Sequence, residues 1–429
     1  MALPWLLPLL VTLPQQLAPI ARVQKVSARE GGFTAPLRDL DQFGRVLTPL
    51  GDLDLDGVGE LAVGALGDDD GGLDRGAFHV LFPRADGSVV RSVKSSALAP
   101  SFLGRLDDGD QLGRALAGLG DLDGDGIPDL AAGVGKDDDG GPDRGAVWLC
   151  FLERDGSVRT LAKISSTSGG LSGLVNRDEF GRAVCCPGDL DGDGVPDLVV
   201  GAPYDDGGGT NKGAVLLLTL RRDGSVKTQL EISQGRAGFG GPLRSGDLFG
   251  FALAAPGDVD GDGFADLLVG APGDDDLGLS NAGAVWLLHL GPDHTVLRQT
   301  KLGALTPVLG AELRAGDQFG TAVAGFDDRD GDGRPELLFG APKSDGAGRD
   351  RGAAWIVSLA PLGNVSALQR LSSLTGEFPA RLDNGDWFGC AVSPLGDLDG
   401  DGDLELGLGA RMDDDGGKDR GALYVVFPE

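Results

Sequence analysis

Residues 180–220 read FGRAVCCPGDLDGDGVPDLVVGAPYDDGGGTNKGAVLLLTL, and this stretch decides the fold. At its centre an acidic loop of the form Asp-x-Asp-x-Asp-Gly-x-x-Asp runs from Asp189 to Asp197, between two apolar segments. Successive copies of this loop, ending in Asp or Glu, lie 68 to 70 residues apart, and the other five begin at Asp52, Asp121, Asp258, Asp328 and Asp397. Self-similarity at a fixed long period predicts a repeat architecture rather than several unrelated domains.

Each repeat is expected to hold four short strands, A to D in chain order. In the third repeat the apolar segments 182–186, 198–203 and 213–218 are separated by the acidic loop and by a second polar stretch. An Asp-Gly turn at 223–224 then leads into a fourth segment, 226–232. No segment carries a sustained helical period. Four antiparallel strands per unit, repeated radially, predict an all-β propeller.

The two ends of the chain predict how the ring closes. Residues 20–27, IARVQKVS, resemble the fourth strand of the second repeat, VRTLAKIS at 158–165. The sixth repeat ends after its third strand, so residues 20–27 are expected to complete it. Pairing the two ends would remove the open edges of the array. We therefore expect a single domain over residues 19–429, built from six four-stranded blades, with a seven-bladed ring as the alternative.

Charge and composition exclude some classes of function. A formal net charge of −29 argues against nucleic acid, whose phosphates require a basic face, and against electrostatic docking on anionic lipid. Residues 1–18 are expected to be a signal peptide that directs the chain to the cell surface, the medium or the periplasm. Their apolar run is too short and too rich in proline to span a membrane. The cysteines are expected to be buried thiols rather than a disulfide framework: Cys150, Cys185, Cys186 and Cys390.

The acidic loops have the ligand pattern that Ca²⁺ prefers, which is six to eight oxygen atoms. Positions 1, 3 and 5 would direct carboxylates inward, glycine at position 6 permits the sharp turn, position 7 offers a backbone carbonyl, and the acid at position 9 closes the site. An EF-hand would need Glu at position 12, transition metals would prefer His or Cys, and Mg²⁺ suits such a cage less well. We expect about six Ca²⁺ ions, one per blade. The expected ligands are Asp52, Asp54, Asp56, Val58 and Glu60; Asp121, Asp123, Asp125, Ile127 and Asp129; Asp189, Asp191, Asp193, Val195 and Asp197; Asp258, Asp260, Asp262, Phe264 and Asp266; Asp328, Asp330, Asp332, Arg334 and Glu336; and Asp397, Asp399, Asp401, Asp403 and Glu405.

Phe-Gly, the acidic loop and Gly-Ala-Pro occur in this order, and in this respect the chain resembles FG-GAP repeats, which build the calcium-binding propeller of integrin α subunits. In the third repeat Phe-Gly is 180–181 and Gly-Ala-Pro is 201–203. Departures include Leu-Gly at 112–113 and Gly-Ala-Arg at 409–411. The integrin propeller has seven blades, whereas six repeats are counted here. The resemblance implies that the ions hold the blades together on the face away from the ligand.

Two of the loops depart from the common pattern. Leu55 occupies position 4 of the first loop, where the others have glycine, and Arg334 occupies position 7 of the fifth. We expect the first and fifth loops to bind Ca²⁺ more weakly than the rest.

The strand order places the B–C and D–A loops at the opposite end from the acidic loops. The B–C loops form a second acidic series, and in four of them an arginine is expected to pair with a neighbouring loop carboxylate: Arg75, Arg144, Arg351 and Arg420. Loops at one end of a rigid scaffold commonly bind partners. One equivalent position of strand C is mostly aromatic, and we expect it to pack between blades rather than to bind sugar: His79, Trp148, Leu216, Trp286, Trp355 and Tyr424.

These features favour an extracellular, calcium-stabilised module for protein binding or adhesion, acting as a monomeric domain on an unidentified extracellular protein or glycan. A carbohydrate-binding lectin is the alternative, and a secreted hydrolase is a less favoured one. His79, His289 and His294 share no blade position, and neither a nucleophile elbow nor a zinc motif is present. The sequence therefore predicts a protein that is not an enzyme and that neither binds nucleic acid nor inserts into a membrane.

Overall fold

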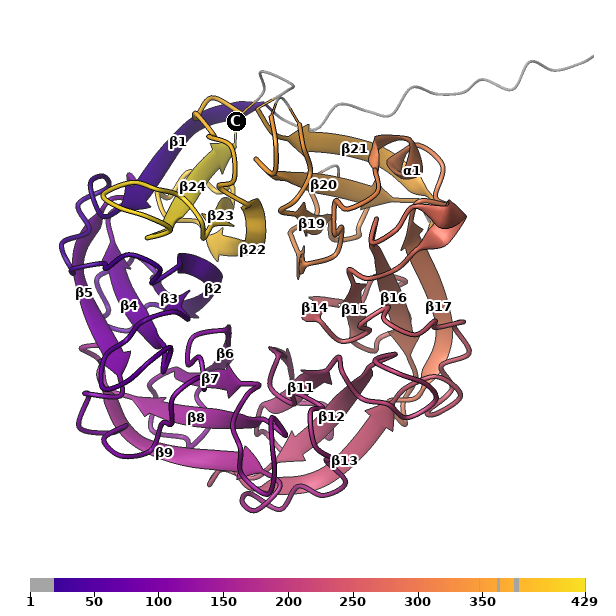
Figure 1. Ribbon diagram of the computed structural model, residues 1–429, viewed down its shortest axis with the longest axis horizontal. Coiled ribbons are helices and arrows are strands. Elements are labelled where there is room, and N and C mark those ends of the chain that lie inside the picture. Colours follow the sequence, from indigo (N-terminus) through magenta and orange to yellow (C-terminus); the bar gives the residue numbers. More distant parts are fainter. Residues whose placement is uncertain (1–18, 330, 347, 361–362, 374–377, 429) are drawn as a thin grey trace, which may run out of the picture.

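A computed structural model describes residues 19–428 apart from 330, 347, 361–362 and 374–377, and it is a closed ring of six four-stranded antiparallel sheets (Figure 1). The all-β, six-bladed propeller predicted from the repeats is thereby confirmed, and the seven-bladed alternative is wrong. The expected signal peptide, residues 1–18, lies outside the described residues.

The first five blades are each built from four consecutive strands, with the first strand of each at the centre of the ring. Their strands are β2 (Phe43–Gly51), β3 (Glu60–Ala65), β4 (Ala77–Pro83) and β5 (Val89–Ser96); β6 (Ala115–Gly120), β7 (Asp129–Val134), β8 (Ala146–Leu152) and β9 (Val158–Ser165); β10 (Ala183–Gly188), β11 (Asp197–Ala202), β12 (Ala214–Leu220) and β13 (Val226–Ile232); β14 (Ala252–Gly257), β15 (Asp266–Ala271), β16 (Ala284–Leu290) and β17 (Val296–Gly303); β18 (Ala322–Gly325), β19 (Leu337–Ala341), β20 (Ala353–Leu359) and β21 (Val365–Leu371). Two single helical turns lie in the loops: η1 (Asp276–Gly278) and α1 (Leu309–Glu312).

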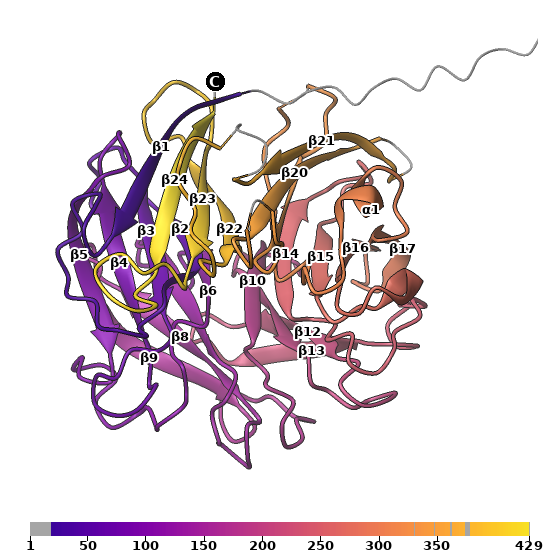
Figure 2. The same ribbon diagram turned by 45° about the horizontal axis from the view of Figure 1, so that its top comes forward.

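The sixth blade joins the two ends of the chain. It contains β22 (Phe388–Gly396), β23 (Glu405–Ala410), β24 (Ala422–Pro428) and β1 (Ile20–Ser27), in the order β22-β23-β24-β1. β1 pairs antiparallel with β24, from Ile20 opposite Pro428 to Ser27 opposite Ala422. Figure 2 shows β1 beside β24 at the outer edge of this blade. The predicted closure by the N-terminal strand is confirmed.

The Phe-Gly pair fixes the contact between one blade and the next. Phe180 is fully buried, and its N–H donates to the carbonyl of Arg144 in the preceding blade at 3.0 Å. Gly181 has φ of +91°, and a Cβ there would lie 2.2 Å from the carbonyl oxygen of Ala146. Only glycine tolerates both the dihedral angle and the close approach. The motif therefore lets neighbouring blades touch through their backbones.

The hydrophobic core lies between neighbouring blades, and the aromatic position of strand C is part of it. Trp355 is fully buried and Trp148 is 5% exposed. Trp286 meets Phe239 edge to face, with ring centroids 5.2 Å apart. The expectation that these rings pack as core is confirmed, and they are not available to stack on a sugar.

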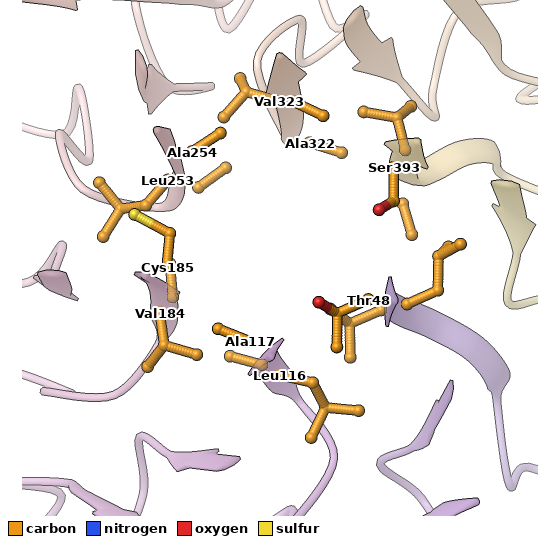
Figure 3. Close-up of a pocket in the computed structure, with 18 of the residues that line it drawn as sticks. Thr48, Leu116, Ala117, Val184, Cys185, Leu253, Ala254, Ala322, Val323 and Ser393 are labelled. Carbon is orange, nitrogen blue, oxygen red and sulfur yellow. The ribbon is translucent and has the colours of Figure 1, made fainter. Parts of the chain in front are cut away.

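The innermost strand of each blade lines a central channel. The cavity there has a volume of about 300 Å³. Figure 3 shows Thr48, Ala117, Val184, Ala254 and Ser393 around it, one from each of five innermost strands. The wall of the channel therefore combines small aliphatic side chains with a few hydroxyl groups.

Candidate metal centres in the acidic loops

All six acidic loops share one frame of hydrogen bonds. The carboxylate at position 1 accepts the N–H of position 6 at 2.7–3.0 Å, from Asp52 with Gly57 in the first loop to Asp397 with Gly402 in the sixth. The carboxylate at position 5 accepts the N–H of position 7 at 2.9–3.0 Å. These bonds explain why acids recur at positions 1 and 5, because each one replaces a backbone partner in a tight turn.

The acid at position 9 anchors the loop to its blade. In every repeat it accepts the N–H of position 2 at 2.5–3.1 Å, as Asp197 does from Leu190. Asp197 also accepts from Leu220 on strand C at 2.9 Å. All six of these carboxylates are 0–1% exposed: Glu60, Asp129, Asp197, Asp266, Glu336 and Glu405. Position 9 therefore carries a buried carboxyl group at the base of the loop.

Three carboxylates converge in the first three loops. One oxygen from each of positions 1, 3 and 9 lies within 4.8 Å of the other two: Asp52, Asp54 and Glu60; Asp121, Asp123 and Asp129; Asp189, Asp191 and Asp197. In the fourth loop Asp258, Asp260 and Asp262 form such a group. Asp330, the expected position 3 of the fifth loop, lies outside the described residues.

Electrostatics at the loops fit a cation. Burial raises the pKa of Glu60 to about 7, helped by the nearby charges of Asp54 and Asp56 and opposed by the hydrogen bond from the Leu53 N–H. Burial, with two loop aspartates, raises the pKa of Asp129 to about 6. A divalent ion at the point of convergence would favour the charged form of each acid. Hard oxygen donors of this kind suit Ca²⁺, and the full ligand set of each loop stays a prediction.

Cations from the outermost strand of the same blade reach five of the loops, and sequence reasoning missed them. Lys227 lies 2.9 Å from Asp191 and 2.7 Å from Asp193. Arg159 makes the same contacts in the second loop, at 2.6 Å from Asp123 and 2.9 Å from Asp125. The other three contacts are Arg91 with Asp54, Arg298 with Asp260 and Arg22 with Asp399. The sequence signal that could have predicted these contacts is the basic residue that recurs near the start of strand D.

The fourth loop also recruits a histidine. His289, on β16, is 3% exposed, and its Nδ1 lies 3.1 Å from Asp266 and 3.2 Å from Asp260. The acidic loops contain no His in sequence, but the sheet pairing brings this one from strand C. Equivalent positions in other blades hold Phe82, Phe151 and Thr219, so the fourth loop alone among these has a nitrogen donor.

The first loop differs from the others where Leu55 replaces glycine. Leu55 has φ of +65°, a conformation that costs a branched side chain free energy. The glycine at this position donates its N–H to position 1 in the second, third, fourth and sixth loops, at 2.7–2.8 Å. In the first loop the donors to Asp52 are Asp56 and Gly57. Weaker binding at this loop stays a prediction.

At the opposite end of the ring, lysines neutralise the B–C aspartates. Lys163, on β9, lies 2.7 Å from both Asp137 and Asp139. Three other blades repeat this arrangement: Lys25 with Asp413 and Asp415, Lys94 with Asp68 and Asp70, and Lys301 with Asp274 and Asp276. An ammonium group thus lies between the acids of these four loops.

The four arginines of the B–C loops bind across the boundary to the next blade. Arg75 pairs with Asp108 at 2.8 Å and Arg420 with Asp39 at 2.9 Å, which confirms the expected carboxylate partner. For Arg144 and Arg351 the prediction is wrong, because their Nε donates to the amide oxygens of Asn176 and Asn384, at 2.8 and 2.9 Å. An amide accepts the same bond without the charge.

Residues 112–150, 180–218 and 249–288 match the family model for the FG-GAP repeat. Integrin alpha pat-2 of Caenorhabditis briggsae is 31% identical over 245 residues, which are 56% of this chain and 18% of that protein. Integrin alpha-PS2 of Drosophila melanogaster is 30% identical over 265 residues, 60% of this chain and 17% of that protein. Integrin alpha-IIb of Homo sapiens is 34% identical over 158 residues, 36% of this chain and 14% of that protein.

These findings confirm FG-GAP repeats and similarity to integrin α subunits. The chain spans less than a fifth of the length of these relatives. Among the described residues, no helix is both long enough and apolar enough to cross a membrane.

Proposed function

We propose that this chain is an extracellular binding module of the adhesion type, in which Ca²⁺ ions in the acidic loops stabilise the blades and the opposite face recognises a protein. The observation that carries the proposal is the convergence of three carboxylates in loops that repeat one hydrogen-bond frame. Similarity to integrin α subunits supports both the extracellular location and a binding role rather than an enzymatic one.

The residues of each loop divide the work of holding an ion. In the first three loops positions 1, 3 and 9 provide the converging oxygens, and in the fourth loop positions 1, 3 and 5 do so. In the third loop position 5 also orients the peptide at position 7 by accepting its N–H. Strand D supplies a basic side chain that shields positions 3 and 5. A bound Ca²⁺ would neutralise the carboxylates and tie strand A to strand B, so that metal binding would couple to folding.

Calorimetric titration and thermal melting test the metal sites. We expect several Ca²⁺ ions per chain and a marked fall in melting temperature when a chelator removes them. Asp191→Asn should remove one ion, because Asp191 contributes a converging oxygen but no bond of the loop frame. Asp223→Asn, in an exposed turn of the same blade, is the matched control. An unchanged melt after confirmed metal loss would refute the proposed role of calcium.

Exposed aliphatic side chains favour a protein ligand on the opposite face. Of the twelve large hydrophobic residues that are exposed in the described part of the chain, eight lie in B–C or D–A loops: Leu40, Leu73, Leu98, Leu103, Val175, Leu277, Leu305 and Val308. Leu98 and Leu103 share one D–A loop and are each at least 60% exposed, which favours an interaction surface there. A sugar site would instead favour exposed aromatic rings, and the strand C aromatics are buried.

Binding assays can separate the protein ligand from the glycan alternative. Immobilised protein would be exposed, in buffer with Ca²⁺, to a panel of extracellular matrix proteins and to a glycan array. We expect binding to at least one protein, weakened by Leu98→Ser together with Leu103→Ser. Leu297→Ser, equally exposed on the outer strand β17, should leave it unchanged. Binding to glycans alone, or equal loss in the control, would contradict the proposal.

A further inference from the structure

Four arginines gather at the mouth of the central channel, on the face opposite the acidic loops. Arg45, Arg114 and Arg182 each follow the Phe-Gly or Leu-Gly pair of the first three blades, and Arg411 replaces the proline of Gly-Ala-Pro in the sixth. All four line one cavity of about 240 Å³ that continues into the channel. A protein with a net charge of −29 thus concentrates positive charge at one point on its axis.

These guanidinium groups are removed from water. Arg182 is 5% exposed and Arg45 is 8% exposed. Burial, together with repulsion from Arg411 and Arg114, lowers the pKa of Arg45 to about 9. Burial also lowers the pKa of Arg182, and Arg114 and Arg45 add to that effect. Arginine is the most strongly basic side chain, so a lowered pKa means that the folded protein destabilises the charged form of these guanidinium groups.

The protein leaves several of the donors unused. In the described part of the chain, no group accepts a hydrogen bond from Nε or Nη1 of Arg182, or from Nε of Arg114. Arg45 reaches the Cys390 carbonyl at 3.5 Å, the limit for a hydrogen bond. Arg114 and Arg411 each donate to a neutral glutamine, Gln111 and Gln42 respectively. Neutral acceptors satisfy geometry but leave the charge uncompensated.

Glu179 is the one carboxylate within 4.0 Å of these guanidinium groups among the described residues. Its Oε2 lies 3.8 Å from Arg114 and 3.9 Å from Arg182, beyond hydrogen-bond distance. Four guanidinium groups and one carboxylate leave a local charge of +3. Buried charge of this size is costly unless an opposite charge joins it.

We propose that the channel mouth binds a compact oxyanion of charge −2 or more, a tetrahedral oxyanion such as sulfate or phosphate or a small dicarboxylate. Planar guanidinium groups pair with the oxygens of such anions through two parallel hydrogen bonds, and four of them surround the cavity. Two aromatic rings that also line the cavity pack against two of the arginines. Arg182 lies 3.7 Å from the Phe251 ring centroid, and Arg411 lies 4.5 Å from that of Trp387. This site is independent of the calcium loops and of any protein ligand.

Isothermal titration with sodium sulfate and with sodium succinate tests the site and distinguishes the two classes of anion. The protein would first be dialysed into a chloride buffer, and ionic strength would be matched with sodium chloride. We expect one ion to bind per chain and the melting temperature to rise with anion concentration. The preferred class of anion would be the one with the lower Kd.

Arg182→Met removes the most buried donor without leaving a cavity. We expect it to weaken anion binding at least tenfold, and to melt no lower than wild type in chloride, because an unpaired buried charge is lost. Should it fail to fold, Arg411→Gln on the half-buried rim is expected to weaken binding similarly. Arg349→Met, at a side chain that is 87% exposed, should bind as wild type. The proposal would be overturned if neither sulfate nor succinate bound. It would also be overturned if Arg182→Met and Arg349→Met weakened binding equally.

Discussion

A buried aspartate lies two positions before the Phe or Leu of each Phe-Gly or Leu-Gly pair, and Asp110→Asn should change how stability depends on pH. All six aspartates are 1–5% exposed, and each accepts the N–H three residues before it at 2.6–2.9 Å: Asp41, Asp110, Asp178, Asp247, Asp317 and Asp386. Asparagine keeps the acceptor for this bond, as in the bond from Asp107 to Asp110, and removes the charge.

The magnitude follows from the pKa of Asp110. Burial raises it from 3.8 to about 7, helped by the neighbouring charges of Asp137 and Asp107 and opposed by the bond from Asp107 and by Lys163. Between pH 4 and pH 7 the folded state therefore binds more protons than the unfolded state, and stability falls as pH rises. From pH 5 to pH 7 the loss is at most about 3 kcal/mol, at 1.36 kcal/mol per pH unit. Because the effective dielectric constant at such a site is higher than that of a dry protein interior, the expected loss of stability is smaller, about 1.5 kcal/mol.

Urea unfolding at pH 5, 6, 7 and 8, followed by tryptophan fluorescence at constant ionic strength and saturating Ca²⁺, measures this effect. The free energy of unfolding of Asp110→Asn, relative to wild type, should rise by about 1.5 to 3 kcal/mol between pH 5 and pH 8. Asp108→Asn is the control, since that side chain lies in the same loop and is 59% exposed. A difference between variant and wild type that stays constant across this pH range would refute the reasoning.

Three further changes test other parts of the structure. Val26→Asp places a charge at a residue of β1 that is 1% exposed, so the melting temperature and protease resistance should fall sharply. The control Ala21→Asp, at the exposed start of the same strand, should change neither. Trp355→Ala should cost about 3 to 5 kcal/mol in urea unfolding, because the ring is fully buried between blades; a cost below about 1 kcal/mol would contradict that packing. Arg159→Gln removes the cation beside Asp123, so calorimetry should show tighter Ca²⁺ binding at the second loop, whereas weaker binding would mean that the arginine assists the ion.

The repeat made most of the fold predictable. In the third unit the segments expected as strands at 198–203 and 226–232 are found as β11 and β13, within one residue at each end. Each strand is decided locally, by alternation between turn residues and apolar runs. Closure was also predictable, because residues 20–27 have the pattern of a strand D that the last repeat lacks.

Contacts between elements were not predictable in the same way. His289 reaches Asp266 because β16 pairs with β15, and nothing in the sequence of the acidic loop announces a histidine 23 residues later. Arg182 and Arg411 lie 229 residues apart in sequence and line the same cavity only because the ring closes. Lysines equivalent to Lys163 occur in three other blades, so their regular spacing could have indicated a shared role. Their aspartate partners could not be predicted, because these depend on which end of the strand faces the B–C loop.

The pairing of β1 with β24 also sets the timing of folding during synthesis. Ribosomes add about 5 to 20 residues per second, so β1 emerges roughly 20 to 80 seconds before its partner. Until then the earlier blades form an open arc, and its exposed edge strands can pair with another chain. Closing the ring also requires β1 and β24, which are far apart in sequence, to find each other. Ring closure is therefore a slow folding step. The interval before β24 emerges is therefore when the arc of blades has the greatest need of a chaperone.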